Sequence, residues 1–586
     1  MEGSASHAPR STKFNPWIAW LRGNESQLSL VLSLFIGALV GLVVVTFILL
    51  TGRLAARMYP AGGAGWRRIL VPTLGSLATG YLLYRFFPNA RGSGIPQTKY
   101  ALFVEDGRIR FRTILGKFFC CSASLASGIS LGREGPSVQI GAGLASMIAR
   151  RLSLSTEFVK ALVPVGCSAA LAAAFNTPIA AVLFSLEEIL GDLHAPVLGS
   201  VVLSSATAWM VLHLVLGDEP LFHVAGYRLV HPLEFAIYAV LGVAGGLGSV
   251  CFVKLLLALR KWFMSLPAKT VWLQPVAGGL TVGIMGFFVP EVLGVGYNYV
   301  ERVLNGDMVL RTVVLLIVLK IVATAVCYGS GNAGGIFGPA LFIGAMIGGA
   351  VGSVAHSLLP AFTASPGAYA LVGMGAAFAG IIRTPLTSVI MIFEVTRDYS
   401  IIVPLMIANL IAFFISYKLQ RDPIYEALAQ QDGVHLPTSR SRAKPLRFQV
   451  AQAMREPPGL LSPDMEVAEA AAEVRRYAMD TLPVVDDHRL WGMIAKWELE
   501  SAIAQGGADK RLSELFLTRT TGSAGEFPHV HPDHGVELAL ERMGATGYNV
   551  LPVVSRADVR RLLGVVALDD ILDVYGLLKI RAVSTE

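Results

Sequence analysis

The sequence predicts an all-α polytopic membrane domain followed by a smaller soluble α/β domain, and three observations carry this prediction. The 586-residue chain is 54% hydrophobic and only 15% charged, which is too apolar for one soluble globule. About a dozen apolar stretches lie between Gln27 and Leu419, and no Asp, Glu, Lys or Arg occurs from Ile321 to Ile382. Beyond Gln420 the chain has the charged and polar composition of an ordinary soluble protein.

The N-terminal segment predicts an uncleaved start on the cytoplasmic side. It carries Arg10, Lys13 and Arg22 and has no small-residue cleavage site after a short apolar core. The net charge of +7 agrees with this orientation. Because no stripe of alternating aromatic and basic residues accompanies the basic clusters, we expect them to anchor loops at lipid headgroups and to bind no nucleic acid.

The apolar part contains an internal repeat that points to its functional site. GPSVQIGAGLAS from Gly135 resembles GPALFIGAMIGG from Gly338. FNTPIAAVLFSLEE resembles IRTPLTSVIMIFEV, so that Glu187 is paired with Glu394. Duplicated membrane folds commonly place their substrate near the midplane, where helices broken by glycine and proline meet.

Three such breaks stand out: RGSGIPQ at 91–97, LGREGPSV at 131–138 and NAGGIFGPAL at 332–341. Each is expected to precede a helix, because proline is tolerated in the first turn. A helix N-terminus offers free N–H groups and about half a positive elementary charge, so several together would hold an anion without a lysine or arginine. One break alone equally serves a kink or close helix packing. The combination of three predicts an anion site.

Glu134 of GREGP predicts a gate at that site. An ionised carboxylate would be held by the same N–H groups and would mimic the anion, whereas the protonated form would release the site. The group would then act both as a gate and as a proton carrier. The alternative is a salt bridge from Glu134 to Arg133 or Lys117.

The tail beyond Gln420 contains a second internal repeat. Two LPVV strings, in TLPVVDDHRLWGMIA and NVLPVVSRADVRRLLGVVA, lie at the same offset from Pro463 and Pro532. Each copy predicts a helix, an LPVV strand, a hairpin, a GMIA or GVVA strand and a further helix. The pattern resembles a pair of CBS modules, a tandem that often binds adenine nucleotides between its copies.

The nucleotide signature of that family, Gly-x-x-Ser/Thr-x-x-Asp, is altered in both copies. Because the hydroxyl is missing in each, we expect a dimerising or structural role rather than adenine-nucleotide binding, and no required cofactor. The altered signatures are Gly492, Ala495, Glu498 and Gly564, Ala567, Asp570. A histidine cluster is interpreted as solvated side chains rather than a metal site: His529, His531 and His534.

The membrane motifs and the tail together resemble the CLC family of chloride channels and proton-coupled chloride antiporters. GSGIP, GREGP and GGIFGP occur in the family's order, followed by the tyrosine of TRDYSIIVPL and the CBS pair. The resemblance implies a homodimer whose subunits each hold a pathway between two inverted halves. The implied domains are a cytoplasmic segment 1–27, a membrane domain 28–425, a linker 426–447 and CBS modules at 448–507 and 508–580.

The resemblance also implies site residues. Ser93 and Tyr399 match the hydroxyls that contact chloride in that family, and both are neutral donors weak enough to release an anion. Glu134 matches its external gating glutamate. The implied anion-binding set is Ser93, Gly94, Ile95, Gly132, Arg133, Glu134, Gly135, Ile336, Phe337 and Tyr399.

The acids of AAVLFSLEEILGD bear on the choice between exchanger and channel. They end an apolar stretch, where the negative end of a helix dipole disfavours them. Glu187 is expected to pair with a cytoplasmic cation. Glu188 matches the position that accepts cytoplasmic protons in CLC antiporters and is apolar in most CLC channels. We expect chloride/proton exchange in a bacterial inner membrane with both termini cytoplasmic; the alternative is a passive channel gated by pH or voltage.

An enzyme of another class is the competing interpretation of Ser93, since intramembrane proteases also use a serine at a glycine-rich helix start. Such an enzyme requires a base, and no motif ties a histidine to Ser93. No HExxH metal motif exists either. The sequence therefore predicts a transporter whose partners are chloride, protons, lipid and a second copy of the chain.

Overall fold

The chain forms two compact units, residues 1–439 and 440–586. The computed structural model describes residues 25–60, 62–193, 196–218, 220–222, 229–434, 436, 448–477, 479–487, 489–519, 527–556 and 558–576. Most of the expected cytoplasmic segment 1–27 lies outside these residues. Seven of the described helices are long and apolar enough to cross a membrane, and three shorter apolar helices accompany them. The first unit is an integral membrane domain.

The described helices of the membrane unit fall into two series of the same order. The first series is α2 (Glu25–Met58), α3 (Arg67–Arg85), α4 (Ile95–Phe103), α5 (Phe111–Ala126), α6 (Glu134–Arg151), α7 (Thr156–Phe175), α8 (Pro178–Phe184) and α9 (Leu198–Leu216). The second is α10 (Glu234–Met264), α11 (Gln274–Phe288), α12 (Tyr297–Leu304), α13 (Leu310–Gly329), α14 (Phe337–Leu358), α15 (Pro366–Ile382), α16 (Pro385–Thr396) and α17 (Ile402–Leu419).

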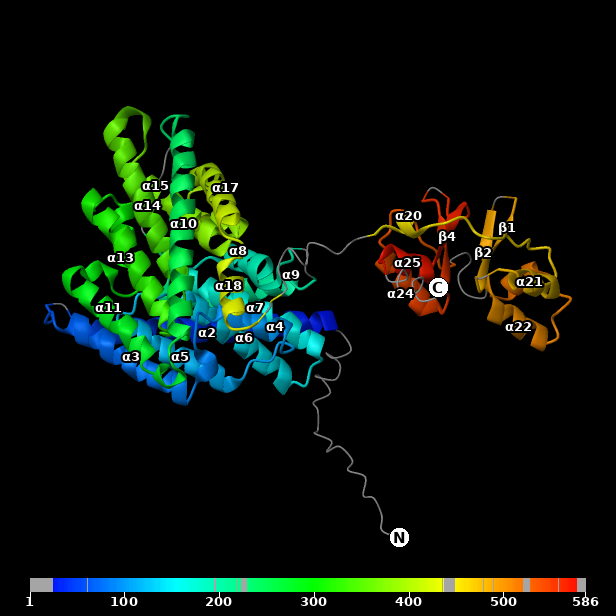
Figure 1. Cartoon of the computed structure of the whole chain (residues 1–586), viewed down its shortest axis with the longest axis horizontal. Helices are drawn as coiled ribbons and strands as arrows, with labels where there is room; N and C mark the ends of the chain where they lie inside the picture. Colours follow the sequence, from blue (N-terminus) through cyan, green and yellow to red (C-terminus); the bar gives the residue numbers. More distant parts are fainter. Residues whose placement is uncertain are drawn as a thin grey trace, which may run out of the picture. The chain divides into compact units, whose positions relative to one another are not determined.

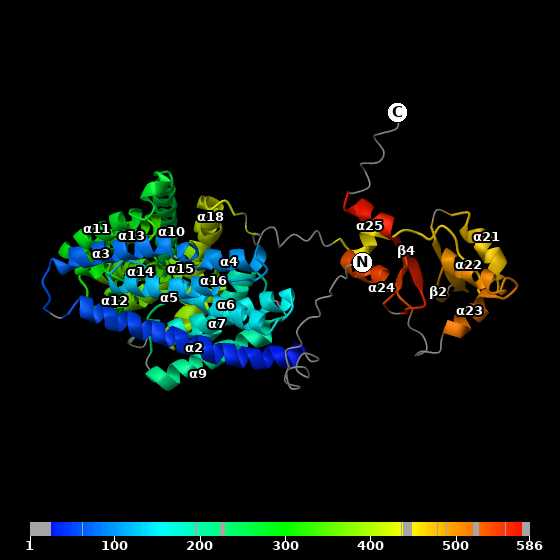
Figure 2. The ribbon, with the colours of Figure 1, turned by 90° about the horizontal axis from the view of Figure 1, so that it is seen from below.

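Equivalent helices pack in equivalent pairs. The helix α6 packs on α7 as α14 packs on α15, and the latter two run side by side (Figure 1). The helix α2 lies along α9 (Figure 2), as α10 packs along α17. Glycine allows the first kind of contact, because a Cβ on Gly141 would lie 2.3 Å from the Gly166 carbonyl oxygen. At the equivalent place, a Cβ on Gly344 would lie 2.4 Å from the Gly373 carbonyl oxygen.

Short elements complete the unit. The segment that carries the two acids is a π-helix, η2 (Ser185–Leu190), continuous with α8. The 3-10 turns are η1 (Pro88–Ala90), η3 (Ala268–Thr270), η4 (Pro290–Val292), η5 (Pro360–Phe362) and η6 (Tyr399–Ile401). A last helix, α18 (Ile424–Gln431), packs on α4 and α10. The membrane unit therefore continues past residue 425, where the sequence predicted the start of a linker.

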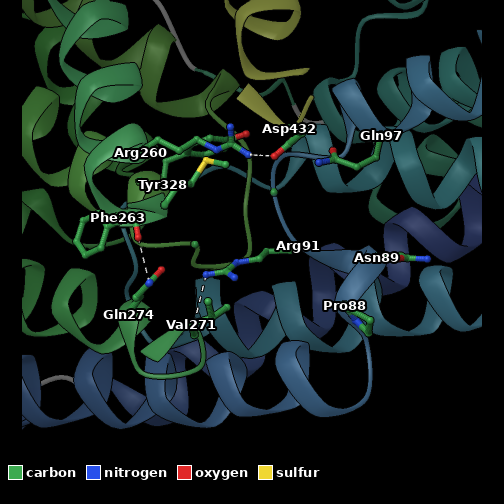
Figure 3. A pocket seen from close by; sticks show the side chains of 14 residues that line it. Pro88, Asn89, Arg91, Gln97, Arg260, Phe263, Val271, Gln274, Tyr328 and Asp432 are labelled. Atoms are coloured by element: carbon green, nitrogen blue, oxygen red, sulfur yellow. Dashed lines mark hydrogen bonds and ion pairs between the residues drawn. The ribbon is translucent and has the colours of Figure 1, made fainter. Parts of the chain in front are cut away.

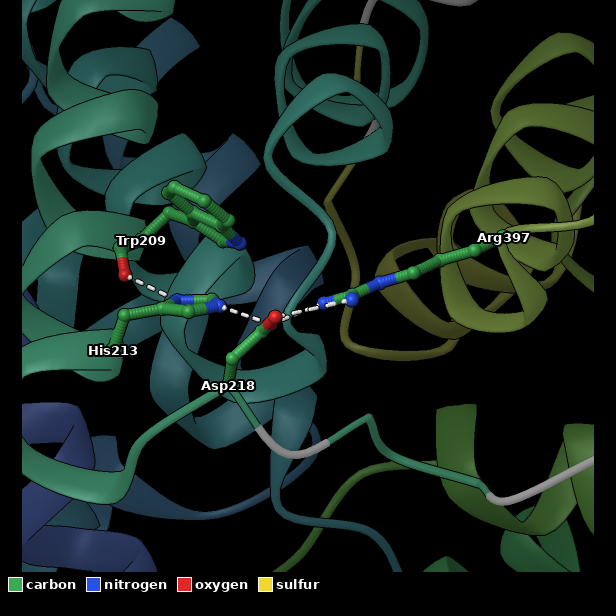
Figure 4. A network of polar contacts seen from close by, with 4 residues as sticks. All are labelled: Trp209, His213, Asp218 and Arg397. Atoms are coloured by element: carbon green, nitrogen blue, oxygen red, sulfur yellow. Dashed lines mark hydrogen bonds and ion pairs between the residues drawn. The ribbon is translucent and has the colours of Figure 1, made fainter.

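A surface network joins the end of the first series to the turn between α16 and α17 (Figure 4). Asp218, which follows α9, forms an ion pair with Arg397, the residue that ends α16. Its carboxylate also lies 3.0 Å from His213 Nε2, and His213 Nδ1 lies 3.0 Å from the Trp209 carbonyl oxygen. Hydrogen bonds from Arg397 and His213 lower the pKa of Asp218 to about 2.

The second unit contains two β-hairpins of matching register. Strand β1 (Thr481–Asp486) pairs antiparallel with β2 (Arg489–Ala495), and β3 (Val550–Val554) pairs with β4 (Leu562–Ala567). The predicted LPVV, GMIA and GVVA strands are confirmed. The helices of the unit are α20 (Val450–Ala453), α21 (Val467–Val474), α22 (Lys496–Ala504), α23 (Leu512–Arg519), α24 (Val536–Thr546) and α25 (Leu568–Val574).

The two modules exchange their first segments, which the predicted boundaries 448–507 and 508–580 did not anticipate. Val450 of α20 packs in the core that contains Val553 and Ile571 of the second module. Conversely, Leu512 of α23 packs in the core of the first module with Leu482. The core into which a helix packs depends on the surface that its apolar face fits. The order of the helices in the sequence does not determine it.

Candidate anion site

The three predicted breaks each precede a helix and meet at one place. The N-termini of α6 and α14 are joined by two backbone hydrogen bonds of 2.7 Å, in which Gly132 and Gly335 each donate to the other's carbonyl oxygen. The turn before α4 closes on the same point. A Cβ on Gly94 would lie 2.6 Å from the Gly135 carbonyl oxygen, and one on Gly135 would lie 2.6 Å from that of Ser93. Only glycine allows these backbones to touch.

Local capping fixes the start of α4. Gly94 has a φ of +103°, which favours glycine, and its N–H donates to Gln97 Oε1 at 2.9 Å. Lys117 of α5 donates from Nζ to the Gly92 carbonyl oxygen at 2.8 Å. The lysine therefore holds the turn and does not pair with Glu134, as one alternative had it. Ile95, the first residue of α4, is fully buried.

Two buried hydroxyl groups and an aromatic ring belong to this part of the fold. Ser93 Oγ and Tyr425 Oη are buried and have no hydrogen-bond partner among the described residues. Phe337, the first residue of α14, stacks with Tyr425 at a centroid distance of 6.4 Å. It also contacts Phe184 and Phe378 at 5.1 and 5.0 Å. Unpaired buried hydroxyls are costly unless a ligand engages them.

The structure does not bring Tyr399 to this junction, so the expectation for that residue is wrong. Tyr399 lies in η6, has 78% of its surface exposed and contacts the ring of Phe393. Tyr425 of α18 is the tyrosine whose ring contacts Phe337 at the start of α14. Sequence reasoning missed it because Tyr425 was the last residue of the predicted membrane domain, directly before the predicted linker, and was given no role. The signal was present, since Ile424, Tyr425 and Leu428 form the apolar face of a helix that follows a proline.

Glu134 is the first residue of α6 and is fully buried. The hydroxyl of Tyr297, in α12, donates to Glu134 Oε1. Arg133 Nε forms an ion pair with the same oxygen at 3.9 Å, so the alternative of a salt bridge to Arg133 is present beside the Tyr297 contact. The guanidinium also stacks over the Tyr297 ring at 5.7 Å. Oε2 has no hydrogen-bond partner in the described part of the chain. Tyr297 was not predicted, because nothing local to GYNYV links it to GREGP.

The unpaired oxygen of Glu134 lies between the two joined helix starts. A Cβ on Gly132 would be 2.4 Å from Oε2, and one on Gly338 would be 3.5 Å away. Gly338 belongs to the first turn of α14. The carboxylate therefore folds back over its own turn toward the positive end of the α14 dipole. The remaining expected members, Arg133 and Ile336, are the N-cap residues of α6 and α14.

The two acids of η2 have different partners. Glu188 Oε1 accepts a hydrogen bond from Lys99 Nζ at 2.8 Å, and both side chains are buried. Glu187 Oε2 accepts from Thr387 N at 2.9 Å and from its Oγ1 at 2.7 Å. The expected cation therefore pairs with Glu188, and Glu187 caps α16. Tyr425 lies within electrostatic range of both Glu188 and Glu134.

Converging helix N-termini, with helices broken at glycine and proline in two repeats, define a membrane protein of the two-repeat, broken-helix class. The chain belongs to the family described as voltage gated chloride channel, which matches residues 75–417. CBS domains match residues 450–505 and 524–576. The membrane domain thus consists of two inverted repeats and is followed by a tandem CBS domain.

Bacterial relatives cover most of the membrane unit. The chain is 35% identical over 383 residues to a putative chloride channel protein ClcB-like from Ralstonia nicotianae, covering 64% of this chain and 89% of the relative. It is 33% identical over 354 residues to the H(+)/Cl(-) exchange transporter ClcA from Vibrio campbellii, covering 59% and 76%.

Solved structures share the fold. A slow cyanobacterial Cl−/H+ antiporter matches with a TM-score of 0.64 and 27% identity, covering 69% of this chain and 97% of its own. A eukaryotic CLC transporter matches with a TM-score of 0.60 and 19% identity, covering 94% and 98%. The second match concerns the fold alone.

Proposed function

We propose that this protein exchanges chloride for protons across the membrane. The observation that carries the proposal is the junction of three helix starts, where Ser93 Oγ and Tyr425 Oη are buried without a hydrogen-bond partner among the described residues. Backbone N–H groups and neutral hydroxyls attract an anion without the full charge of a lysine. Such a site binds chloride and still releases it during turnover.

Glu134 is the gate in this proposal. Its carboxylate lies at the start of α14, in a place that an anion would occupy, and Tyr297 holds it there. Protonation removes the charge that the helix dipoles attract, so the side chain leaves and chloride enters. Each opening of the gate thereby carries one proton into the pathway.

Glu188 is the proton acceptor on the side of the tail. It is buried on η2 and ion-paired with Lys99, and Tyr425 lies within range of both acids. A proton taken up at Glu188 would move toward Glu134 while chloride moves the other way. The Vibrio relative is named as an H(+)/Cl(-) exchange transporter, and the cyanobacterial structure as a Cl−/H+ antiporter.

A passive chloride channel is the second candidate. The Ralstonia relative is named as a putative chloride channel. The buried ion pair with Lys99 also fits this candidate, because it gives Glu188 a structural partner within the chain. In a channel, Glu188 would be a structural acid.

We further propose a homodimer with both termini in the cytoplasm of a bacterial cell and the membrane unit in the inner membrane. The basic N-terminal segment and the net charge of +7 support this orientation. The relatives named above from Ralstonia and Vibrio are bacterial proteins.

The tail works without a nucleotide in this proposal, because both signature carboxylates already have partners in the chain. Glu498 accepts from Ala495 N at 2.8 Å and from the Tyr548 hydroxyl at 3.1 Å. Asp570 accepts from Ala567 N at 3.0 Å and pairs with Arg455 Nε at 3.0 Å. A nucleotide would have to displace these contacts.

The test is the zero-current voltage of liposomes that contain the purified protein, under combined chloride and pH gradients. The zero-current voltage of an exchanger differs from the chloride equilibrium potential and shifts with pH. We expect this of the unmodified chain. Glu188→Gln should return the voltage to the chloride potential, whereas Glu157→Gln, at an exposed acid, should not. An unmodified protein that rests at the chloride potential at every pH is a channel.

A further inference from the structure

A cavity of about 460 Å³ lies against the GSGIP turn (Figure 3). Gly92 and Gln97 line it, and Gln97 is the residue that caps the Gly94 N–H. Ser93 follows Gly92 in the chain, so the turn separates this cavity from the junction of helix starts. The cavity is therefore one turn of backbone away from the proposed chloride site.

Three charged residues from distant parts of the chain line the cavity: Arg91, Arg260 and Asp432. Arg260 of α10 pairs with Asp432 at 2.5 Å. It also donates to the Leu428 carbonyl oxygen at 3.2 Å and to Gln431 Oε1 at 2.9 Å. The charge of Arg260 is thus matched by Asp432, and its remaining donors hold the end of α18.

Arg91, in contrast to Arg260, forms no ion pair with a carboxylate of the described residues. Only its Nη2 donates, over long distances of 3.4 and 3.3 Å to the carbonyl oxygens of Val271 and Ser330. Within the described residues, Nε and Nη1 have no hydrogen-bond partner and no carboxylate pairs with the guanidinium. The fold makes room for it: a Cβ on Gly331 would lie 2.1 Å from Arg91 Nη2. Figure 3 shows Arg91 extending into the cavity below Arg260.

We propose that this cavity is a second anion site, in which Arg91 binds chloride and Asp432 is a tethered competitor. The two guanidinium groups and one carboxylate leave one net positive charge in a half-enclosed space, which raises the local anion concentration. Asp432 mimics a bound anion on Arg260. When it leaves, a second guanidinium becomes available to chloride.

The site combines Arg91, early in the membrane unit, with Asp432, near its C-terminal end. Asp432 lies two residues before the end of the continuous described segment, after which the chain runs toward the tail. The cavity therefore opens on the side of the membrane where the tail begins. Chloride from that side would meet Arg91 before it reaches Ser93. This inference rests on the proposed function, because it concerns the supply of the transported anion.

Chloride flux through the full-length protein in liposomes tests the proposal. Arg91→Gln should raise the half-saturating chloride concentration on the tail side by about three- to tenfold and leave the maximal rate unchanged. Arg91→Lys should restore most of the affinity. Asp432→Asn should lower the half-saturating concentration, because it frees Arg260. Lys254→Gln, at an exposed lysine on the same helix as Arg260, should change nothing.

Bromide provides a readout that does not depend on transport. Crystals grown in bromide should show an anomalous peak within hydrogen-bond distance of the Arg91 guanidinium, and the peak should be absent in Arg91→Gln. Bromide at Arg91 in a protein that moves no chloride would refute the proposed function and retain this site. An unchanged half-saturation in Arg91→Gln together with no bromide at Arg91 would overturn the inference.

Discussion

The two halves of the membrane unit use one backbone design and carry different side chains on it. GREGP starts α6 and GIFGP starts α14, and Gly132 and Gly335 at their first positions pair with each other. At the same place in each motif, one half has Glu134 and the other has Phe337. The former is held by Tyr297, whereas the latter packs among aromatic rings.

Buried lysines show how far the shared design extends. Lys117 precedes Glu134 by the same 17 residues that separate Lys320 from Phe337. Lys117 Nζ donates to the carbonyl oxygen of Gly92 at 2.8 Å. The equivalent Lys320 donates to the carbonyl oxygen of Gly294, in GVGYN, at 2.6 Å. Each half thus uses a buried ammonium to hold the turn before a short helix.

The capping acids are also shared, and each reaches across to the other half. Glu187 accepts from Thr387 at the start of α16. Glu394 accepts from the backbone N–H groups of Ile179 and Ala180, at the start of α8, at 2.9 and 2.7 Å. A carboxylate at a helix N-terminus satisfies free N–H groups and complements the dipole. This pair fastens the two halves together.

The halves differ at the positions to which we assign chemistry. The differing pairs are Ser93 and Val295, Ile95 and Tyr297, Glu134 and Phe337, and Glu188 and Val395. Residues present in both halves hold the backbone, whereas each hydroxyl and carboxylate to which we assign a transport role is present in only one half. The comparison teaches that duplication built the scaffold and that function lies where the copies diverge. Five measurements can break or sharpen this conclusion.

The largest effect is expected for Glu134→Gln, at the main point of divergence. Glutamine cannot ionise, so the gate would behave as permanently protonated. Proton movement should fall to the level of empty liposomes, while chloride still moves. The zero-current voltage should then equal the chloride potential at every pH. Continued uphill proton movement in this variant would remove Glu134 from the mechanism.

Tyr297→Phe should raise chloride turnover by about tenfold. A hydrogen bond to a charged group contributes about 1.5–3 kcal/mol, and its loss shifts the gate toward the open position. Chloride efflux from liposomes measures the change. Tyr299→Phe, on the same helix, is the matched control. Unchanged turnover would mean that Tyr297 contributes only to packing.

Ser93→Pro should weaken the preference for chloride over nitrate several-fold. The turn before α4 tolerates proline, whereas the hydroxyl that contacts the anion is lost. The ratio of nitrate to chloride flux is the measurement. Ser93→Ala separates the hydroxyl from the backbone, since it removes only the former. If neither variant changes the ratio, Ser93 does not set selectivity.

Glu394→Ala, at a shared position, should affect stability and leave coupling intact. It exposes two N–H groups of α8 without a partner, which costs about 1–3 kcal/mol. The midpoint of thermal unfolding in detergent should fall by a few degrees, and the zero-current voltage should stay that of the unmodified protein. A changed voltage would show that shared residues also take part in transport.

The smallest effect, none, is expected when ATP is added to the full-length protein. The two tail modules are alike at their signature carboxylates, which both cap their own helices. Without divergence between the copies, we expect no ligand chemistry there. Calorimetry should show no binding heat. Micromolar affinity would contradict both the tail assignment and the rule drawn from the membrane halves.

The sequence by itself determined the features that depend on local backbone chemistry. Glycine and proline define the starts of α4, α6 and α14, so the motifs alone mark these three turns and Glu134 at one of them. The roles expected for Ser93 and Phe337 came from the family resemblance. Alternation and hairpin signals similarly located β1 to β4. The internal repeats predicted two copies of one fold in each unit, because similar sequences form similar secondary structure.

Only the tertiary structure decided which residues meet across long separations. It replaced Tyr399 by Tyr425, added Tyr297 to the carboxylate of Glu134 and gave Glu188 the cation expected for Glu187. In each case the partner lies on another helix. Several residues of the same type occur in the sequence, and the packing of the whole unit determines which of them makes the contact. Periodicity reports which face of a helix is buried and says nothing about what it is buried against.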